Sequence, residues 1–186
     1  MFLHKAIRLL LGLYIMSICG TTVFGNIQIK QMEISQVQEV KHMIVESILQ
    51  NLPMTIEDIE ELDKQDEFAD VFNVQSAYYD NGGMFYVVLD EDKIVGSGAI
   101  KKLDDETCEL KRMWLLKPYI GHGYGLAMAN KLFEFAKNHG YKRVVLDVYS
   151  PETQQKAVTF YKKLGFYEIK PYKKFLAKLY MEKILN

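Results

Sequence analysis

Three alternate glycines mark the segment of this sequence that is best suited to hold a ligand. Gly121, Gly123 and Gly125 enclose His122 and Tyr124, and a helical pattern begins at the last glycine. A residue without a Cβ lets the backbone approach a ligand closely, and a helix N-terminus presents unpaired N–H groups and the positive end of its dipole. The segment therefore predicts a cradle for a pyrophosphate, with a purely structural turn as the alternative.

The surroundings of these glycines exclude two common nucleotide-binding motifs. A dinucleotide-binding fingerprint requires an early βαβ unit, a final glycine and an acidic partner, none of which is placed correctly here. No Gly-Lys-Ser/Thr sequence follows, so the segment is not a P-loop.

Composition narrows the ligand classes further. The chain of 186 residues carries 23 basic and 24 acidic side chains, a formal net charge of -1, so nucleic acid is not an expected partner. Cys19 and Cys108 form no CxxC motif or His/Cys cluster, so no metal site is predicted.

The elements that must position the glycines form one predicted domain over residues 26–186. Strands are expected at 26–32, 84–89, 93–102, 107–116, 143–149, 166–169 and 175–184, and helices at 35–49, 56–79, 125–139 and 153–164. Ser35 with Gln38 is the expected capping box of the first helix, and Thr55 the cap of the second. The order of strands and helices indicates an α/β domain with a mixed sheet.

Two segments in this order resemble a known family. Glu109–Leu115 (Glu-Leu-Lys-Arg-Met-Trp-Leu), followed by Ile120–Gly125 and a long amphipathic helix, looks like the acetyl-CoA motif of the GNAT superfamily. Leu146–Val148 (Leu-Asp-Val), followed by Ala157–Phe166 (Ala-Val-Thr-Phe-Tyr-Lys-Lys-Leu-Gly-Phe), resembles the second hallmark of that family. The resemblance covers residues 26–186. It implies a mixed, mostly antiparallel, twisted sheet with helices on both faces and splayed central strands.

The resemblance also implies how coenzyme A is bound. A loop of the form Gln/Arg-x-x-Gly-x-Gly/Ala wraps the pyrophosphate with backbone amides. The matching residues here are Ile120, Gly121, His122, Gly123, Tyr124 and Gly125. Ile120 departs from the pattern, but backbone donors do not depend on its side chain. His122 either adds a phosphate contact or is an exposed loop histidine.

Further cofactor contacts follow from the same resemblance. The main chain of the fourth family strand grips the pantetheine arm and the acyl carbonyl, a role that falls to Met113, Trp114 and Leu115. Gln154 stands where many members carry an asparagine that contacts the cofactor. For Trp114, a place in the core is the alternative.

Acyl transfer from a thioester to an amine requires a base near the amine and a proton donor near the sulfur. The resemblance makes Tyr161 the donor and Glu109 the candidate base; a core aromatic and a solvated strand glutamate are the alternatives. Simple alternation places Glu109 on the same strand face as Leu115. Desolvation in a closed site would raise the pKa of Glu109 into the range useful for a base.

The sequence therefore predicts an N-acetyltransferase that moves acetyl from acetyl-CoA to a primary amine of a small molecule, peptide or protein. A catalytically idle acyl-CoA-binding sensor on the same fold is the alternative, which the departures at Ile120 and Gln154 favour slightly. Acetyl-CoA is the expected acyl donor and no metal is expected. The acceptor is not identified by the sequence, and a homodimer stays open.

Residues 1–25 form a hydrophobic segment outside this domain. Lys5 and Arg8 precede an apolar run over residues 9–24, as in a signal sequence with cleavage near Gly25. As a helix the run would reach about 24 Å, short of a bilayer core of about 30 Å.

Three readings of this segment are open: a cleaved signal with an exported domain, a membrane anchor through residues 7–25, or an over-long start. Positive charge keeps the N-terminal end of a span in the cytoplasm. A single span would then carry the domain away from cytosolic acetyl-CoA, so a cytoplasmic domain is favoured.

Overall fold

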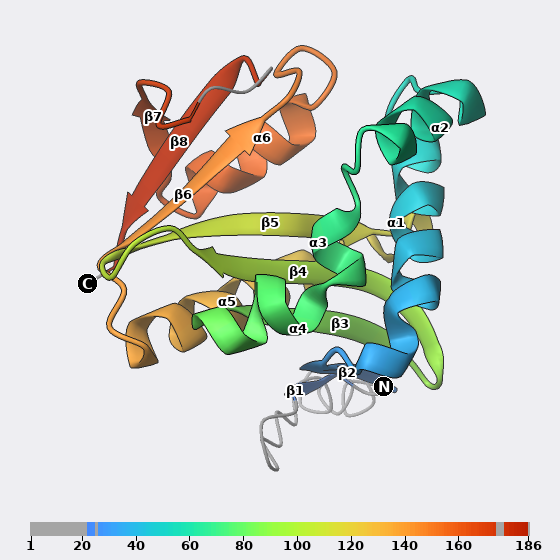
Figure 1. Ribbon diagram of the computed structural model, residues 1–186, viewed down its shortest axis with the longest axis horizontal. Helices are drawn as coiled ribbons and strands as arrows, with labels where there is room; N and C mark the ends of the chain where they lie inside the picture. The colour runs from blue at the N-terminus through green and yellow to red at the C-terminus, as the bar shows by residue number, and fades with distance from the viewer. Residues whose placement is uncertain (1–21, 25, 174–176, 186) are drawn as a thin grey trace, which may run out of the picture.

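The computed structural model describes residues 22–24, 26–173 and 177–185. Within these residues the strands form one eight-stranded sheet in the order β1-β2-β3-β4-β5-β6-β8-β7 (Figure 1). The strands are β1 (Thr22–Phe24), β2 (Ile27–Gln31), β3 (Met84–Asp90), β4 (Lys93–Lys102), β5 (Thr107–Leu115), β6 (Arg143–Val148), β7 (Tyr167–Ile169) and β8 (Leu179–Ile184). β5 and β6 pair in parallel and the other neighbours pair antiparallel. The predicted mixed, mostly antiparallel sheet is confirmed.

Helices cover both faces of this sheet. They are α1 (Val37–Asn51), α2 (Ile56–Lys64), α3 (Ala69–Phe72), α4 (Val74–Ala77), α5 (Tyr124–Asn138) and α6 (Gln155–Lys163). In Figure 1, α1, α3 and α4 lie in front of strands β3 to β5 and α5 lies behind them. The apolar spacing of α5 explains its place, because Met128, Leu132 and Ala136 recur every four residues and all are buried.

The two parallel strands separate after a short ladder. Thr107, Cys108 and Glu109 of β5 pair with Arg143, Val144 and Val145 of β6. Beyond this point β5 continues beside β4 alone, while β6 continues beside β8. The strands β6, β8 and β7 turn away from the plane of β3 to β5 (Figure 1). The predicted splay of the central strands is therefore confirmed.

A β-bulge interrupts β5 at Arg112. The register with β4 shifts between Ala99, which faces Lys111, and Ser97, which faces Trp114. Arg112 has a φ of 54°, and the Ser97 hydroxyl donates a 2.7 Å hydrogen bond to its carbonyl.

The bulge overturns one expectation from the sequence. One extra residue in a strand reverses the alternation of side chains beyond it. Trp114 therefore lies on the face of Glu109, and Leu115 lies on the opposite face. The expectation that Glu109 and Leu115 share a face was wrong, because simple alternation does not allow for an inserted residue.

Other differences are local. The helix expected over residues 56–79 is divided into α2, α3 and α4. Glu33 and Gln36 form the first capping box in place of Ser35 and Gln38, since the Glu33 N–H donates a 2.9 Å hydrogen bond to Gln36 Oε1. The cap at Thr55 is confirmed.

Strand β1 was not expected, and it pairs with β2 at the edge of the sheet. The proposed signal or anchor at residues 1–25 lies outside the described residues except for 22–24. No helix in the described part of the chain is long and apolar enough to cross a membrane.

Candidate active site

The glycine loop has the backbone shape that the sequence pattern requires. Gly121 and Gly123 both have a φ of +89°, and a Cβ added to either would meet no atom within 4 Å. Gly123 is the N-cap of α5, whose first turn contains no acidic residue. The N–H groups and dipole of this helix end are therefore not offset by a local carboxylate.

Gly125 is the point where three elements meet. A Cβ on Gly125 would lie 3.5 Å from Leu115 Cδ1, at the end of β5, and 3.8 Å from Phe160 Cζ on α6. The start of α5 is thus held at the open end of the gap between β5 and β6. His122 and Tyr124 stack with ring centroids 6.1 Å apart beside this opening.

Residues of the loop differ in exposure. Ile120 is 46% exposed, and His122 is also exposed. Neither side chain is held within the protein core, so both are free to face a bound molecule. A contact of either residue with coenzyme A stays a prediction.

The end of β5 is fixed from the opposite face of the sheet. The carbonyl of Leu115 accepts hydrogen bonds from Ser47 Oγ at 2.8 Å and from Asn51 Nδ2 at 3.3 Å, both on α1. Met113 packs towards α5, since a Cβ on Gly98 would approach both its sulfur and Met128. Met113, Trp114 and Leu115 are all partly exposed.

Tyr161 lies on α6, and its ring contacts Phe160 and Phe166 at centroid distances of 5.5 and 5.8 Å. Its hydroxyl makes no hydrogen bond within the described residues. Burial of the hydroxyl, followed by the charge of Asp147, raises the pKa of Tyr161 above its usual value, so the phenol stays protonated. A protonated phenol that has no partner among the described residues can donate to a bound group.

The face of α6 that carries Tyr161 is not fully covered. Ala157, Phe160, Tyr161 and Leu164 share this face, yet each retains partial exposure. None of the α6 residues is buried. Apolar side chains left open beside the gap provide a surface for a further molecule.

Gln154 is used within the turn before α6. The N–H of Ser150 donates a 3.1 Å hydrogen bond to Gln154 Oε1. This contact holds the turn between β6 and α6. A contact of Gln154 with coenzyme A stays a prediction.

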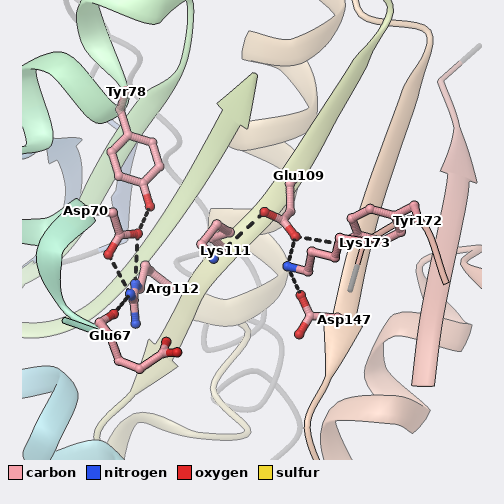
Figure 2. A network of polar contacts seen from close by, with 9 residues as sticks. All are labelled: Glu67, Asp70, Tyr78, Glu109, Lys111, Arg112, Asp147, Tyr172 and Lys173. Atoms are coloured by element: carbon pink, nitrogen blue, oxygen red, sulfur yellow. Dashed lines mark hydrogen bonds and ion pairs between the residues drawn. The ribbon is translucent and has the colours of Figure 1, made fainter. Parts of the chain in front are cut away.

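Glu109 belongs to a polar network across the two parting strands (Figure 2). It is 3% exposed, and it accepts hydrogen bonds from Tyr172 Oη at 2.6 Å and from Lys173 Nζ. Lys173 Nζ also lies 2.6 Å from Asp147 Oδ1 on β6, and Lys111 Nζ lies 3.8 Å from Glu109 Oε2. One lysine therefore links a carboxylate of β5 to a carboxylate of β6.

The network sets the charge of Glu109. Burial alone would raise the pKa of Glu109, but Lys111, Lys173 and Tyr172 outweigh burial and lower it. The expectation that a closed site raises this pKa was wrong, because the sequence did not reveal the two lysines. Burial lowers the pKa of Lys173, but Asp147 and Glu109 outweigh it and raise the pKa, so this ion pair is charged on both sides.

A second network secures the bulge in β5 (Figure 2). Arg112 donates to Asp70 on α3, with Nη2 2.5 Å from Oδ1 and Nε 3.1 Å from Oδ2. Arg112 also donates to the carbonyl of Glu67, and the hydroxyl of the fully buried Tyr78 donates to Asp70. The irregular turn of β5 is thereby tied to the helices in front of the sheet.

Sequence reasoning missed most members of these networks. Asp70, Tyr172 and Lys173 belong to no motif, and Asp147 lies within the second resemblance segment but was given no role there. Their partners are distant along the chain. The sequence did contain one signal for Asp147: it is the only charged residue within the apolar run of residues 144–148. Such a residue in a central strand needs a partner.

Comparison with known proteins agrees with this geometry. Residues 48–166 match the acetyltransferase (GNAT) family. The chain therefore belongs to the GNAT family of acetyltransferases.

The relatives carry the same general name. N-acetyltransferase 8B of Homo sapiens is 31% identical over 103 residues, covering 52% of this chain and 44% of that protein. The uncharacterized N-acetyltransferase YjgM of Escherichia coli (strain K12) is 32% identical over 95 residues, covering 50% and 56%. The match thus spans about half the length of these curated relatives.

Solved structures share the fold. The PaiA N-acetyltransferase of Thermoplasma acidophilum, in complex with coenzyme A, aligns with a TM-score of 0.72 and 20% identity, covering 85% of this chain and 98% of that one. A GNAT-family acetyltransferase of Staphylococcus aureus Mu50 aligns with a TM-score of 0.71 and 23% identity, covering 86% and 99%.

Proposed function

We propose that this protein transfers an acetyl group from acetyl-CoA to a primary amine. The observation that carries the proposal is the meeting of β5, α5 and α6 at Gly125, at the open end of the gap between β5 and β6. A loop with two left-handed glycines and a helix N-terminus lies at this point. These are the features that suit a pyrophosphate followed by an extended arm.

In this proposal the glycine loop binds the pyrophosphate through backbone N–H groups. The pantetheine arm lies along β5 at Met113, Trp114 and Leu115, and the exposed side chain of Ile120 lies beside it. Backbone N–H groups of β5 stabilise the oxyanion that forms when the thioester carbonyl is attacked. The fixed carbonyl of Leu115 supports this role, because α1 holds the strand end in place.

Tyr161 donates the proton that the leaving thiolate requires. The amine nitrogen bonds to the carbonyl carbon, the carbon–sulfur bond breaks, and the sulfur takes the phenolic proton. The pKa of Tyr161 is raised, which supports its protonated state before the reaction.

Glu109 is the proposed acceptor of the amine proton. It is charged, and it lies at the last paired position before the gap. A lowered pKa makes it a weak base when paired with Lys173, so it serves best after that pairing is loosened.

Two measurements test the function. Calorimetry with acetyl-CoA reports binding, and a screen of primary amines with detection of free CoA thiol reports transfer. Binding together with amine-dependent thiol release is the expected result. Binding without release for every amine would favour the alternative, an acyl-CoA-binding sensor, and absence of binding would refute both.

A further inference from the structure

The ammonium group of Lys173 lies in a site made by residues of three separate segments. Asp147 on β6 contributes an oxygen at 2.6 Å, Glu109 on β5 contributes an accepted hydrogen bond, and the Tyr172 ring centroid lies 5.4 Å from Nζ. Tyr172 also donates its hydroxyl hydrogen bond to Glu109. Two carboxylates and an aromatic face are the groups that bind a primary ammonium ion.

This site lies where the two strands begin to part. Glu109 is the last residue of β5 that pairs with β6, opposite Val145, and Asp147 follows two residues later on the same face of β6. Asp147 is close enough to raise the pKa of Tyr161 by its charge. The ammonium of Lys173 is therefore held between Glu109, the proposed base, and Asp147. The charge of Asp147 in turn acts on Tyr161, the proposed acid.

We propose that the carboxylates of Glu109 and Asp147 form the docking site for the ammonium group of the acceptor, and that Lys173 fills this site when no acceptor is bound. The inference rests on the proposed acetyl transfer and adds to it the class of acceptor. That class is a primary alkylammonium on a flexible chain of methylene groups, as at the end of a lysine side chain. Neutral and aromatic amines lack the charge that the two carboxylates require.

Replacement of one ammonium by another avoids leaving either carboxylate without a positive partner. Removal of one partner from a buried ion pair is costly, because the remaining charge is left without compensation. An acceptor that enters as Lys173 leaves keeps both carboxylates paired throughout. Since Lys173 is tethered, its effective concentration is on the order of millimolar, so a simple free amine competes weakly.

The chemical step balances within this arrangement. The bound ammonium gives one proton to Glu109, and the freed nitrogen bonds to the thioester carbonyl carbon. The carbon–sulfur bond breaks and the thiolate takes the proton of Tyr161. Collapse to the amide releases the second amine proton to solvent.

The test uses Lys173→Ala with n-propylamine, which replaces the atoms that the substitution removes. Propylammonium at about 10 mM exceeds the effective concentration of Lys173 in the unaltered protein, which is on the order of millimolar. At this concentration it should raise the melting temperature of Lys173→Ala, and 1-propanol should not. With acetyl-CoA present, Lys173→Ala should release CoA thiol and form N-propylacetamide at least about tenfold faster than the unaltered protein, since the tethered competitor is gone.

Two variants serve as controls. Lys178→Ala removes a lysine from the same connection, where Nζ lies 3.8 Å from Glu152 and the side chain is 64% exposed, and it should behave as the unaltered protein. Lys173→Ala with Asp147→Asn should lose most of the gain, because one of the two carboxylates is then neutral.

Specific outcomes overturn the inference. Propylammonium that stabilises Lys173→Ala but is not acetylated, while acetyl-CoA binds, would make the site a structural ion pair. Equal acetamide formation by the unaltered protein, Lys173→Ala and the double variant would exclude a role for the two carboxylates. Failure of acetyl-CoA to bind the unaltered protein refutes the proposed function itself and is thereby distinguishable.

A measurement on the unaltered protein covers the case in which Lys173→Ala does not fold. The nitrogen signal of the Lys173 ammonium group, observed by nuclear magnetic resonance, should shift as propylammonium is added up to about 100 mM, well above the concentration of the tether. An unchanged signal would show that no free ammonium enters the site, which overturns the inference.

Discussion

Gly121 and Gly123 adopt the same left-handed backbone, each with a φ of +89°, and neither would contact another atom through an added Cβ. Packing inside the protein therefore does not explain the absence of side chains here. The backbone conformation explains part of it, because L-residues avoid this region. In the proposed function, the absent side chains also leave space for coenzyme A above the loop.

Gly123→Val should weaken binding of coenzyme A by tenfold or more, about 1.4 kcal/mol or above. The branched side chain would project from the loop into the space of the pyrophosphate. Calorimetry with coenzyme A measures the effect. Gly140→Val is the matched control, since Gly140 has a φ of +84°, has equally open surroundings and lies after the other end of α5.

The two variants should lose stability to a similar extent, about 1–2 kcal/mol for the left-handed backbone. Only Gly123→Val should lose affinity. Equal affinity in both, with intact folds, would move the pyrophosphate site away from this loop.

Tyr161→Phe should lower kcat at least tenfold, since general-acid catalysis typically contributes about 10² to 10⁴-fold and water can replace part of it. The melting temperature should change little, because the hydroxyl makes no hydrogen bond within the described chain. Steady-state kinetics with an accepted amine and a thermal scan measure the two effects.

Tyr141→Phe is a control that should lose stability and keep its kcat, the reverse of Tyr161→Phe. The hydroxyl of Tyr141 donates a 2.8 Å hydrogen bond to the carbonyl of Gly82, at the end of the sheet away from the glycine loop. Its loss should cost about 1 kcal/mol of stability and leave kcat unchanged. An unaltered kcat in Tyr161→Phe would make Tyr161 a packing residue.

Asp70→Asn should reduce the free energy of unfolding by about 3–5 kcal/mol, because Arg112 stays charged with only 14% of its side chain exposed. Asp63→Asn breaks the more exposed pair with Lys41 and should cost at most about 1 kcal/mol. Urea unfolding of both variants at neutral pH measures the difference. Similar losses in both would mean that the Arg112 pair adds little to stability.

The same pair predicts a dependence on pH. Burial raises the pKa of Asp70, but Arg112 and the hydroxyl of Tyr78 outweigh burial and lower it. A carboxyl with a lowered folded pKa stabilises the protein above its unfolded pKa of about 3.9, and this contribution is lost as the pH falls towards the folded pKa. Stability should therefore fall below about pH 4, and less steeply in Asp70→Asn. Equal slopes in both proteins would exclude Asp70 as the source.

Residues 26–186 should fold without residues 1–25. Strand β1 pairs with β2 at three positions on the outer edge, and the core of the described residues begins at Ile27. A cooperative thermal transition should remain after the deletion, with β2 as the new edge strand. Loss of that transition would make the N-terminal segment part of the domain.

Regular periodicity made most of the elements predictable. Apolar residues at helical spacing predicted α5 from Gly125 to His139, and the helix spans Tyr124–Asn138. Gly140 ends that helix with a positive φ, as expected of a glycine at this position. Local preference and burial act in the same direction in such segments, so the sequence alone is sufficient.

Arg112 illustrates what the sequence does not contain. A positive φ is unusual for arginine, and here the ion pair with Asp70 and the bond from Ser97 hold it. These partners come from other elements, so the bulge depends on tertiary contacts. The charge of Glu109 was misjudged for the same reason, since Lys173 lies 64 residues away in the chain.

Beyond Glu109, β5 has no pairing with β6 although both strands lie in the middle of the sheet. This side of β5 therefore resembles the unpaired side of an edge strand. Edge strands are open to partners. Only three residue pairs join β6 to β5 in the ladder, with the Lys173 bridge beside them, whereas β3, β4 and β5 pair along most of their lengths. Amide hydrogens of β6 and β8 should therefore exchange through an opening of lower free energy than those of β3 and β4. We therefore expect the sheet to open as two cooperative units of unequal stability, which a molecule that fills the gap would join into one.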